Sequence, residues 1–427
     1  MLVLLLEPSL WTTSRSLLLI PPDVLSVSLS ACNIPGRAIP TLRVRRGASR
    51  AKKLYHGRGR VCRRQRRGST MEPYPIKLTY HVRNYAFGER LIPEVLGKEG
   101  VPEGVVAETW EVSDYRETTG IITNGLYAGR TLHDLVLEYP DELVGEGWRG
   151  PHFPLLEKFI DASHMLPVHL HADDETARRK HGEPHGKTEA WHILWAAPDA
   201  TILAGIKEGL TRDDLFEAFK ERDYDAVMSR HPIRAGDTIY VPGGVLHAFG
   251  PDTLVFEVQQ TSDLGQFVMP EDLYGNPLDD ETWEANINAT LDELRTDYHP
   301  RPNPGLALED GRPGTNRRIF CCAGPCFALE LWTLLEPHIE LSHPKRCLTL
   351  SNVGGPARIE YTGGTEPLGR GESCILPAAI GEVRIVPEGE ASLVVCYVPD
   401  LERDVVAPLR EAGYSDEEIR DLGEIDV

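Results

Sequence analysis

One short segment limits the possible folds of this chain more than any other. Residues 236–247 read GDTIYVPGGVLH, which has the spacing G-x5-P-x-G-x2-H. The run before Pro242 predicts a strand, and the glycines after it allow the tight turn that sends the chain back. A second strand would then carry His247. The segment therefore predicts two antiparallel strands joined by a tight turn, with a histidine on the returning strand.

β-Patterns dominate the remainder of the chain and are interrupted by helical signals. Strand-like segments occur at 168–171, 189–194, 237–241, 253–259 and in several pieces between 327 and 396. Helix signals are the capping boxes at Thr211 and Ser415 and the segment 280–296. The segment 236–247 matches the second cupin signature. We therefore expect a mainly β fold with a cupin (double-stranded β-helix, or jelly roll) catalytic domain, a helical insert, and a second, smaller C-terminal cupin domain.

Charge composition divides the chain into unequal parts. Residues 1–70 hold 14 Lys and Arg against 2 Asp and Glu, whereas the remainder holds 31 against 63. We expect 1–70 to be a basic leader that is disordered or not natively translated, with the folded protein beginning near Met71. A catalytic cupin domain with its insert would span 71–300, a C-terminal cupin-like domain 315–400, and an acidic helical tail 401–427.

The same composition limits the classes of function. An excess of 32 negative charges after residue 70 argues against nucleic-acid binding by the body of the protein. No run approaches the roughly 18 uninterrupted apolar residues of a membrane helix, so we expect no membrane partner. The 8 cysteines form no CxxC pair. We therefore expect reduced thiols in a cytoplasmic protein.

Three separated pieces of sequence offer metal ligands. His169 and His171 alternate on one predicted strand, so their imidazoles share a face. Alone they could be two surface histidines, and Lys187 with Glu189 could be a surface ion pair. With His247 they make three histidines and one carboxylate, an N/O set that suits a divalent metal and leaves room for water or substrate. Glu189 lies 18 residues after His171, which disfavours an iron-type, dioxygenase-like cupin.

Four motifs in the same order then identify a resemblance. They are PVHLHADD at 167–174, GKTEAW at 186–191, VPGGVLHAFG at 241–250 and EVQQTSD at 257–263. In these motifs, and over nearly all of 72–400, the chain resembles the class I, zinc-dependent cupin mannose-6-phosphate isomerases. The resemblance implies that one Zn²⁺ per chain is bound by His169, which replaces a glutamine of the family, with His171, Glu189 and His247.

The resemblance also implies a reaction and two further site residues. Lys187 matches the active-site lysine of the family, and Glu257 matches a pocket carboxylate. The implied enzyme is an aldose–ketose isomerase of carbohydrate metabolism that interconverts mannose 6-phosphate and fructose 6-phosphate through a cis-enediol. From the residues alone, Lys187 could instead hold a hydroxyl, and Glu257 could be only a strand residue.

Two departures from the family pattern concern the phosphate. Phe267 stands where the family has an arginine, and Pro167 stands where it has a serine that helps hold phosphate. Arg295 or Arg301 could supply the missing charge. The alternatives left open are a same-fold isomerase of a different or unphosphorylated sugar and a non-catalytic, sugar-binding regulatory cupin. The native metal and the oligomeric state also stay open.

Overall fold

A computed structural model describes residues 29–34, 37–42, 70–309 and 315–427. The chain divides into two compact units, residues 1–67 and 68–427. In the first unit, β1 (Leu29–Ile34) pairs antiparallel with β2 (Arg37–Leu42). The rest of the predicted leader, except Thr70, lies outside the described residues, so its disorder or non-native translation stays a prediction.

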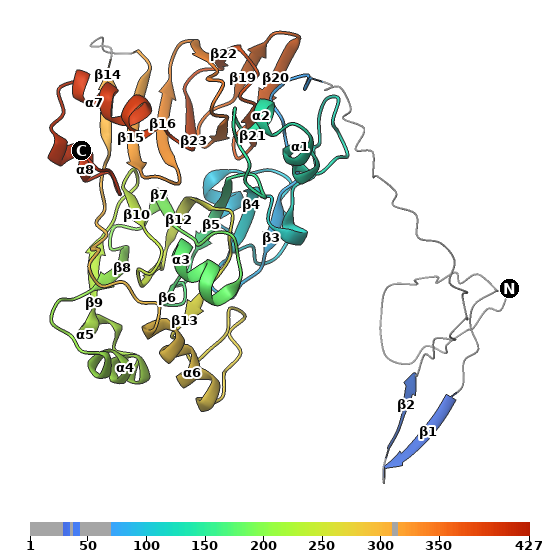
Figure 1. Cartoon of the computed structure of the whole chain (residues 1–427), viewed down its shortest axis with the longest axis vertical. Helices are drawn as coiled ribbons and strands as arrows, with labels where there is room; N and C mark the ends of the chain where they lie inside the picture. Colours follow the sequence, from blue (N-terminus) through green and yellow to red (C-terminus); the bar gives the residue numbers. More distant parts are fainter. Residues whose placement is uncertain (1–28, 35–36, 43–69, 310–314) are drawn as a thin grey trace, which may run out of the picture. The chain divides into compact units, whose positions relative to one another are not determined.

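In the second unit, two antiparallel sheets form a first β-barrel (Figure 1). The larger sheet has the order β10-β7-β12-β5-β4-β3 and consists of β3 (His81–Arg83), β4 (Glu108–Val112), β5 (Leu155–Ala162), β7 (Glu189–Ala196), β10 (Thr238–Val241) and β12 (Thr253–Gln260). The smaller sheet has the order β13-β6-β11-β8-β9 and consists of β6 (His169–Leu170), β8 (Thr201–Ile206), β9 (Met228–Pro232), β11 (His247–Phe249) and β13 (Gln266–Phe267). Trp191 and Ile193 of the larger sheet share a buried core with Ile202 and Phe249 of the smaller one.

Two further antiparallel sheets follow from residue 306 (Figure 1). One has the order β14-β15-β16-β23-β18-β21 and consists of β14 (Leu306–Glu309), β15 (Arg317–Ala323), β16 (Ala328–Leu334), β18 (Leu348–Asn352), β21 (Ser373–Leu376) and β23 (Ala391–Tyr397). The other has the order β17-β22-β19-β20 and consists of β17 (His338–Leu341), β19 (Ala357–Tyr361), β20 (Gly364–Leu368) and β22 (Glu382–Pro387). Their shared core contains Trp332, Ile359 and Leu393.

The central strands β5 and β12 are buried on both faces because each face meets a different core. Phe159 and Phe256 pack edge to face with ring centroids 5.5 Å apart, in the cluster that also contains Phe327, which directly precedes β16. Since successive strand residues point to opposite faces, Lys158 and Glu257 point the other way, into the first barrel. The same two strands therefore build the domain contact and one wall of the barrel interior.

Helices cover the smaller sheet of the first barrel, and further helices form the C-terminal end of the chain. They are α1 (Leu132–Glu138), α2 (Pro140–Leu143), α3 (Asp174–Thr176), α4 (Arg212–Glu221), α5 (Tyr224–Val227), α6 (Asp280–Leu291), α7 (Ala407–Glu411) and α8 (Asp416–Arg420), with short turns of helix at Ile92–Leu96, Arg116–Thr118, Ala177–His181 and Glu402–Val406. Phe219 of α4 and Ile287 of α6 pack on Leu170 and Ala248 of the smaller sheet. The insert thus covers the outer face of that sheet, with α4 and α6 side by side (Figure 1).

One helical segment is shorter than expected. The sequence predicts a helix over 280–296, but α6 ends at Leu291, and the Arg295 N–H donates to the Gly244 carbonyl at 2.7 Å. In the tail, α8 is exposed except at Ile419, which is buried with Leu422 in the C-terminal core. Within the described residues we find no helix with the length and apolar character needed to cross a bilayer.

Candidate metal centre and active site

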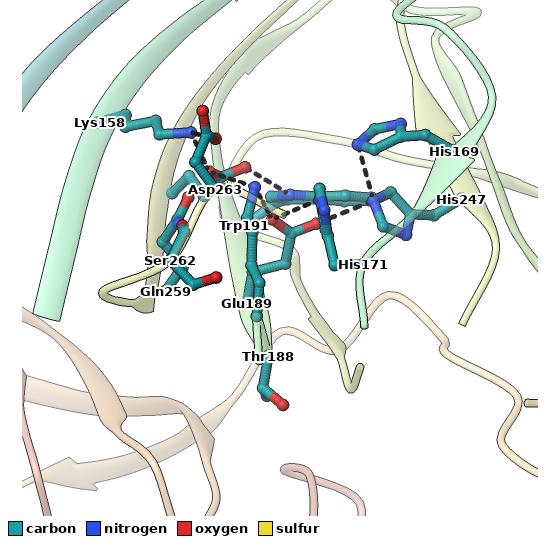
Figure 2. A network of polar contacts seen from close by, with 12 residues as sticks. Lys158, His169, His171, Thr188, Glu189, Trp191, His247, Gln259, Ser262 and Asp263 are labelled. Carbon is teal, nitrogen blue, oxygen red and sulfur yellow. Dashed lines mark hydrogen bonds and ion pairs between the residues drawn. The ribbon is translucent and has the colours of Figure 1, made fainter. Parts of the chain in front are cut away.

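Four side chains converge inside the first barrel, as Figure 2 shows. His169, His171, Glu189 and His247 each offer one ligand atom, and these atoms lie within 4.8 Å of one another. His169 and His247 are direct partners in the β6–β11 pair, and Glu189 begins β7 in the facing sheet. The predicted shared face of His169 and His171 is what brings both rings into the cluster.

Backbone carbonyls fix the tautomers of all three histidines. The Nδ1 atoms of His169, His171 and His247 lie 2.7, 2.5 and 2.7 Å from carbonyl oxygens of the chain. A carbonyl oxygen can only accept a hydrogen bond, so each Nδ1 must carry the hydrogen. In the neutral ring, Nε2 is then an unprotonated lone-pair donor. Metal-binding histidines are held by this same arrangement.

The Nε2 atoms face one another without a hydrogen between them. His247 Nε2 lies 3.1 Å from His169 Nε2 and 3.0 Å from Glu189 Oε1. His171 Nε2 and both Glu189 oxygens are buried and have no hydrogen-bond partner among the described residues. Ring-nitrogen lone pairs and a carboxylate oxygen that face one another in such a space repel unless a cation lies between them. The donor set therefore fits a divalent metal of the zinc type.

The electrostatics favour the ligand forms of these groups. Burial, reinforced by His247, holds the pKa of His169 well below its usual value. Burial and the Lys187 charge do the same for the pKa of His171. For Glu189, burial would raise the pKa, but Lys187 and the histidines outweigh it and hold that pKa well below its usual value. Neutral rings and an ionised carboxylate are what a metal requires.

A row of buried charges extends from this cluster across the larger sheet. Lys187 Nζ lies 2.9 Å from Glu189 Oε2 and 3.6 Å from Glu257 Oε1. Lys158 Nζ lies 3.1 Å from Glu257 Oε1 on the neighbouring strand, and the Trp191 indole N–H donates to Glu257 Oε2 at 3.1 Å. Figure 2 shows Lys158 on the side of the cluster away from His169. Lys187 and Glu257 therefore lie together beside the metal-ligand cluster, as the resemblance implies.

Lys158 was missed by the sequence analysis. Burial would lower its pKa, but the carboxylates of Glu108, Glu257 and Asp263 outweigh burial and raise it. Glu257 shows the opposite balance, because burial and the Glu189 charge raise its pKa despite the two lysines. The available signal was a charged pair inside the apolar run 153–160, FPLLEKFI.

The structure also shows the surroundings of Phe267 and Pro167, the two departures from the family pattern. Phe267 pairs with His169 across β13 and β6 and stacks on its ring, with centroids 5.4 Å apart. The Pro167 carbonyl accepts the hydrogen bond from His169 Nδ1. Arg295 is ion-paired with Asp297 and Glu424. Phe267 thus packs against the ring of His169 and supplies no positive charge for a phosphate. Arg295 is already paired with two carboxylates.

Comparisons with known proteins agree with this geometry. A family profile described as "Mannose-6-phosphate isomerase, cupin domain" matches residues 319–398. The probable mannose-6-phosphate isomerase GmuF of Bacillus subtilis (strain 168) is 36% identical over 297 residues, which cover 70% of this chain and 91% of that protein. The chain belongs to the mannose-6-phosphate isomerase family.

Further members of the mannose-6-phosphate isomerase family show the same relation. ManA of Bacillus subtilis (strain 168) is 27% identical over 70% of this chain and 91% of its own length. A crystal structure of the mannose 6-phosphate isomerase from Bacillus subtilis is 26% identical, has a TM-score of 0.66, and covers 75% of this chain and 99% of its own. A mannose 6-phosphate isomerase bound with zinc and yttrium, 15% identical with a TM-score of 0.56 over 75% of this chain and 98% of its own, shares the fold.

Membership confirms the predicted family and the predicted mainly β cupin fold. The chain is an enzyme of the mannose-6-phosphate isomerase type, and more generally a sugar isomerase.

Proposed function

We propose that this enzyme interconverts mannose 6-phosphate and fructose 6-phosphate through a cis-enediol and depends on a metal. The observation that carries the proposal is the convergence of unprotonated histidine nitrogens and Glu189 beside the pair Lys187 and Glu257. The names of the relatives supply the substrate. An aldose–ketose isomerase needs a group that polarises two sugar oxygens and a group that moves one proton.

For the barrel centre we propose one Zn²⁺, held by His169, His171, Glu189 and His247. The zinc in a structural neighbour with the same fold supports this choice. When bound, the ion supplies Lewis-acid polarisation of the sugar oxygens. The nitrogen of His169, which replaces an amide oxygen of the family, makes the site somewhat softer.

Lys187 and Glu257 carry out the proton transfers in this proposal. Glu257 Oε1 faces two ammonium groups and has no hydrogen-bond partner among the described residues. It takes the proton from C2, and Lys187 donates a proton to the carbonyl oxygen at C1, which gives the enediol. Glu257 then returns its proton to C1, and the hydroxyl proton at O2 returns to Lys187. A raised pKa makes the ionised Glu257 carboxylate a stronger base, which suits a group that must take up a proton and then release it.

The proposed domain roles follow the location of these side chains. All six proposed site residues lie between residues 71 and 300, which we assign as the catalytic domain. Residues 315–400 would support it through the face of β5 and β12 that carries Phe159. Cysteines that are free thiols are Cys321, Cys322, Cys326, Cys347, Cys374 and Cys396. Free thiols suit the reducing cytoplasm that we propose as the compartment.

Arg83 is the cation we propose for the substrate phosphate. Its half-buried guanidinium lies 4.6 Å from the Trp110 ring centroid, and Lys158 Nζ lies 4.5 Å from the same ring. Arg83 Nε is buried without a hydrogen-bond partner among the described residues. Lys158 is neutralised by Glu257. The Arg83 fork is therefore the better donor for a phosphate dianion at the end of the charged row.

Replacing Arg83 by glutamine should raise the KM for mannose 6-phosphate by about 10- to 100-fold and leave kcat within a few-fold. The reason is that one charge-assisted hydrogen bond, about 1.5–3 kcal/mol, is lost in substrate binding. Initial-rate kinetics would measure it. Arg295→Gln is the matched control and should leave KM unchanged. An effect of Arg295→Gln alone would mean that the phosphate lies elsewhere.

Removal of the metal tests the function as a whole. Chelator-treated full-length protein should give no fructose 6-phosphate from mannose 6-phosphate in a coupled assay, and titration with Zn²⁺ should restore turnover. Free mannose should be tested in parallel. Turnover of the free sugar alone would favour an isomerase of unphosphorylated sugars. Sugar binding without any turnover would favour a regulatory cupin.

A further inference from the structure

A second cluster of metal-type ligands lies outside the centre described above. Asp114 follows β4, His133 is the second residue of α1, and His152 precedes β5. One ligand atom from each lies within 4.8 Å of the other two. None of the three belongs to the motifs that identified the family, and the proposed reaction uses none of them.

The Asp114 carboxylate is held in place by hydrogen-bond donors and faces a possible cation position. Its side chain is wholly buried. The Phe153 N–H donates to its Oδ2 at 2.8 Å, and the Thr119 hydroxyl donates to its Oδ1 at 3.3 Å. His133 Nδ1 lies 3.1 Å from both carboxylate oxygens. Backbone and hydroxyl donors hold metal-binding carboxylates in this way, and a buried carboxylate needs a cation nearby.

His152 supplies the second, independent observation. Its Nδ1 is buried and has no hydrogen-bond partner among the described residues, although it lies 3.9 Å from Asp114 Oδ2. The rings of His152 and His133 have centroids 5.6 Å apart. A buried ring nitrogen aimed at a carboxylate without bonding to it indicates that a further atom belongs between them.

We propose that Asp114, His133 and His152 bind a second divalent metal ion of the zinc class. Two imidazoles and one carboxylate are a donor set that zinc and cobalt accept. Metal–ligand bonds of about 2 Å place neighbouring ligand atoms roughly 3.3 Å apart in a tetrahedral site. The 3.1 Å contact already fits, and the 3.9 Å contact closes with a small movement of the His152 ring.

The partial exposure of both histidines leaves coordination positions for water. The ion would tie together the segment after β4, the start of α1 and the segment before β5. Since this site shares no ligand with the barrel centre, the inference does not rest on the proposed isomerase function.

Metal stoichiometry of the full chain tests this site. Chelator-treated protein would be dialysed against Zn²⁺ and its metal content measured, with Co²⁺ absorption spectra as a second readout. Wild-type protein should bind two ions per chain, and His152→Ala and Glu189→Gln should each bind one. His338→Ala is the matched control, because His338 contacts only Glu340 among carboxylates and should leave two.

The outcomes separate the two metal sites. If wild type binds one ion and His152→Ala still binds one, the second site does not exist, and Asp114 with His133 is an ion pair only. If wild type binds one ion and His152→Ala binds none, the second site stands and the barrel centre is the failed proposal. Circular dichroism spectra of the variants would establish that loss of metal is not loss of fold.

Discussion

The Glu189→Gln enzyme should bind zinc more than about 100-fold more weakly and lose nearly all turnover. Outer-shell changes alone reduce metal affinity by about 10- to 100-fold, and this substitution removes the only carboxylate among the four proposed ligands. It also leaves the Lys187 ammonium without its 2.9 Å partner. Glutamine keeps the volume of the side chain, so the effect reports on charge rather than on a cavity.

Zinc titration and the coupled isomerase assay would measure both losses. The matched control is Glu157→Gln, because Glu157 is also a fully buried glutamate of the larger sheet but points away from the barrel interior. It should retain metal affinity and turnover. Equal losses in both variants would show that any buried amide disturbs the enzyme, and would contradict the assignment of Glu189 as a ligand.

Glu157→Gln should also remove a loss of about 3 kcal/mol in unfolding free energy that the wild-type protein undergoes as pH rises from 4.5 to 8. Burial raises the pKa of Glu157 from 4.5 to about 7, although a hydrogen bond from the Thr349 hydroxyl opposes the shift. Its Oε2 has no hydrogen-bond partner among the described residues. An ionised carboxylate at this position is therefore less stable in the folded protein than in the unfolded chain.

The sign follows from the number of bound protons. Between pH 4.5 and about 7 the folded protein keeps the Glu157 proton while the unfolded chain has released it. The free energy of unfolding must therefore fall as pH rises through this range, and its contribution from Glu157 becomes constant above about pH 7. The contribution is most favourable below pH 4.5. Glutamine cannot ionise, so the variant lacks this loss.

Urea unfolding at pH 4.5 and pH 8 would measure the difference. The gain in unfolding free energy of Glu157→Gln over wild type should be about 3 kcal/mol larger at pH 8 than at pH 4.5. The variant acts as its own control, since packing effects of the amide are the same at both pH values. An equal difference at the two pH values would contradict the raised pKa.

Strand periodicity predicted the β-structure and the shared face of two of the clustered histidines, whereas the cupin fold and the full ligand set came from the cupin signature and the family resemblance. The i, i+2 rule placed His169 and His171 on one face, and the turn pattern at 236–247 placed His247 on the returning strand. The capping boxes at Thr211 and Ser415 do begin helices. These features depend on local geometry, and local geometry can be read from the order of residues.

Features that depend on the pairing of distant strands could not be predicted. Lys158 becomes part of the charged row because β5 pairs with β12 in a register that places it opposite Glu257. Phe267 stacks on His169 because β13 pairs with β6. Asp114, His133 and His152 come from three segments, with a spacing of 19 residues from each to the next. A single sequence contains no signal that fixes these registers.

The two-sided burial of β5 and β12 has a consequence for how this enzyme can change. Because side chains alternate, insertion or deletion of one residue in β5 would turn Lys158 toward the C-terminal sheets and Phe159 toward the metal ligands. One such change would disrupt both the row of buried charges and the contact between the domains. Variation in chain length is therefore confined to the loops, and these strands can only diverge by substitution, one face at a time.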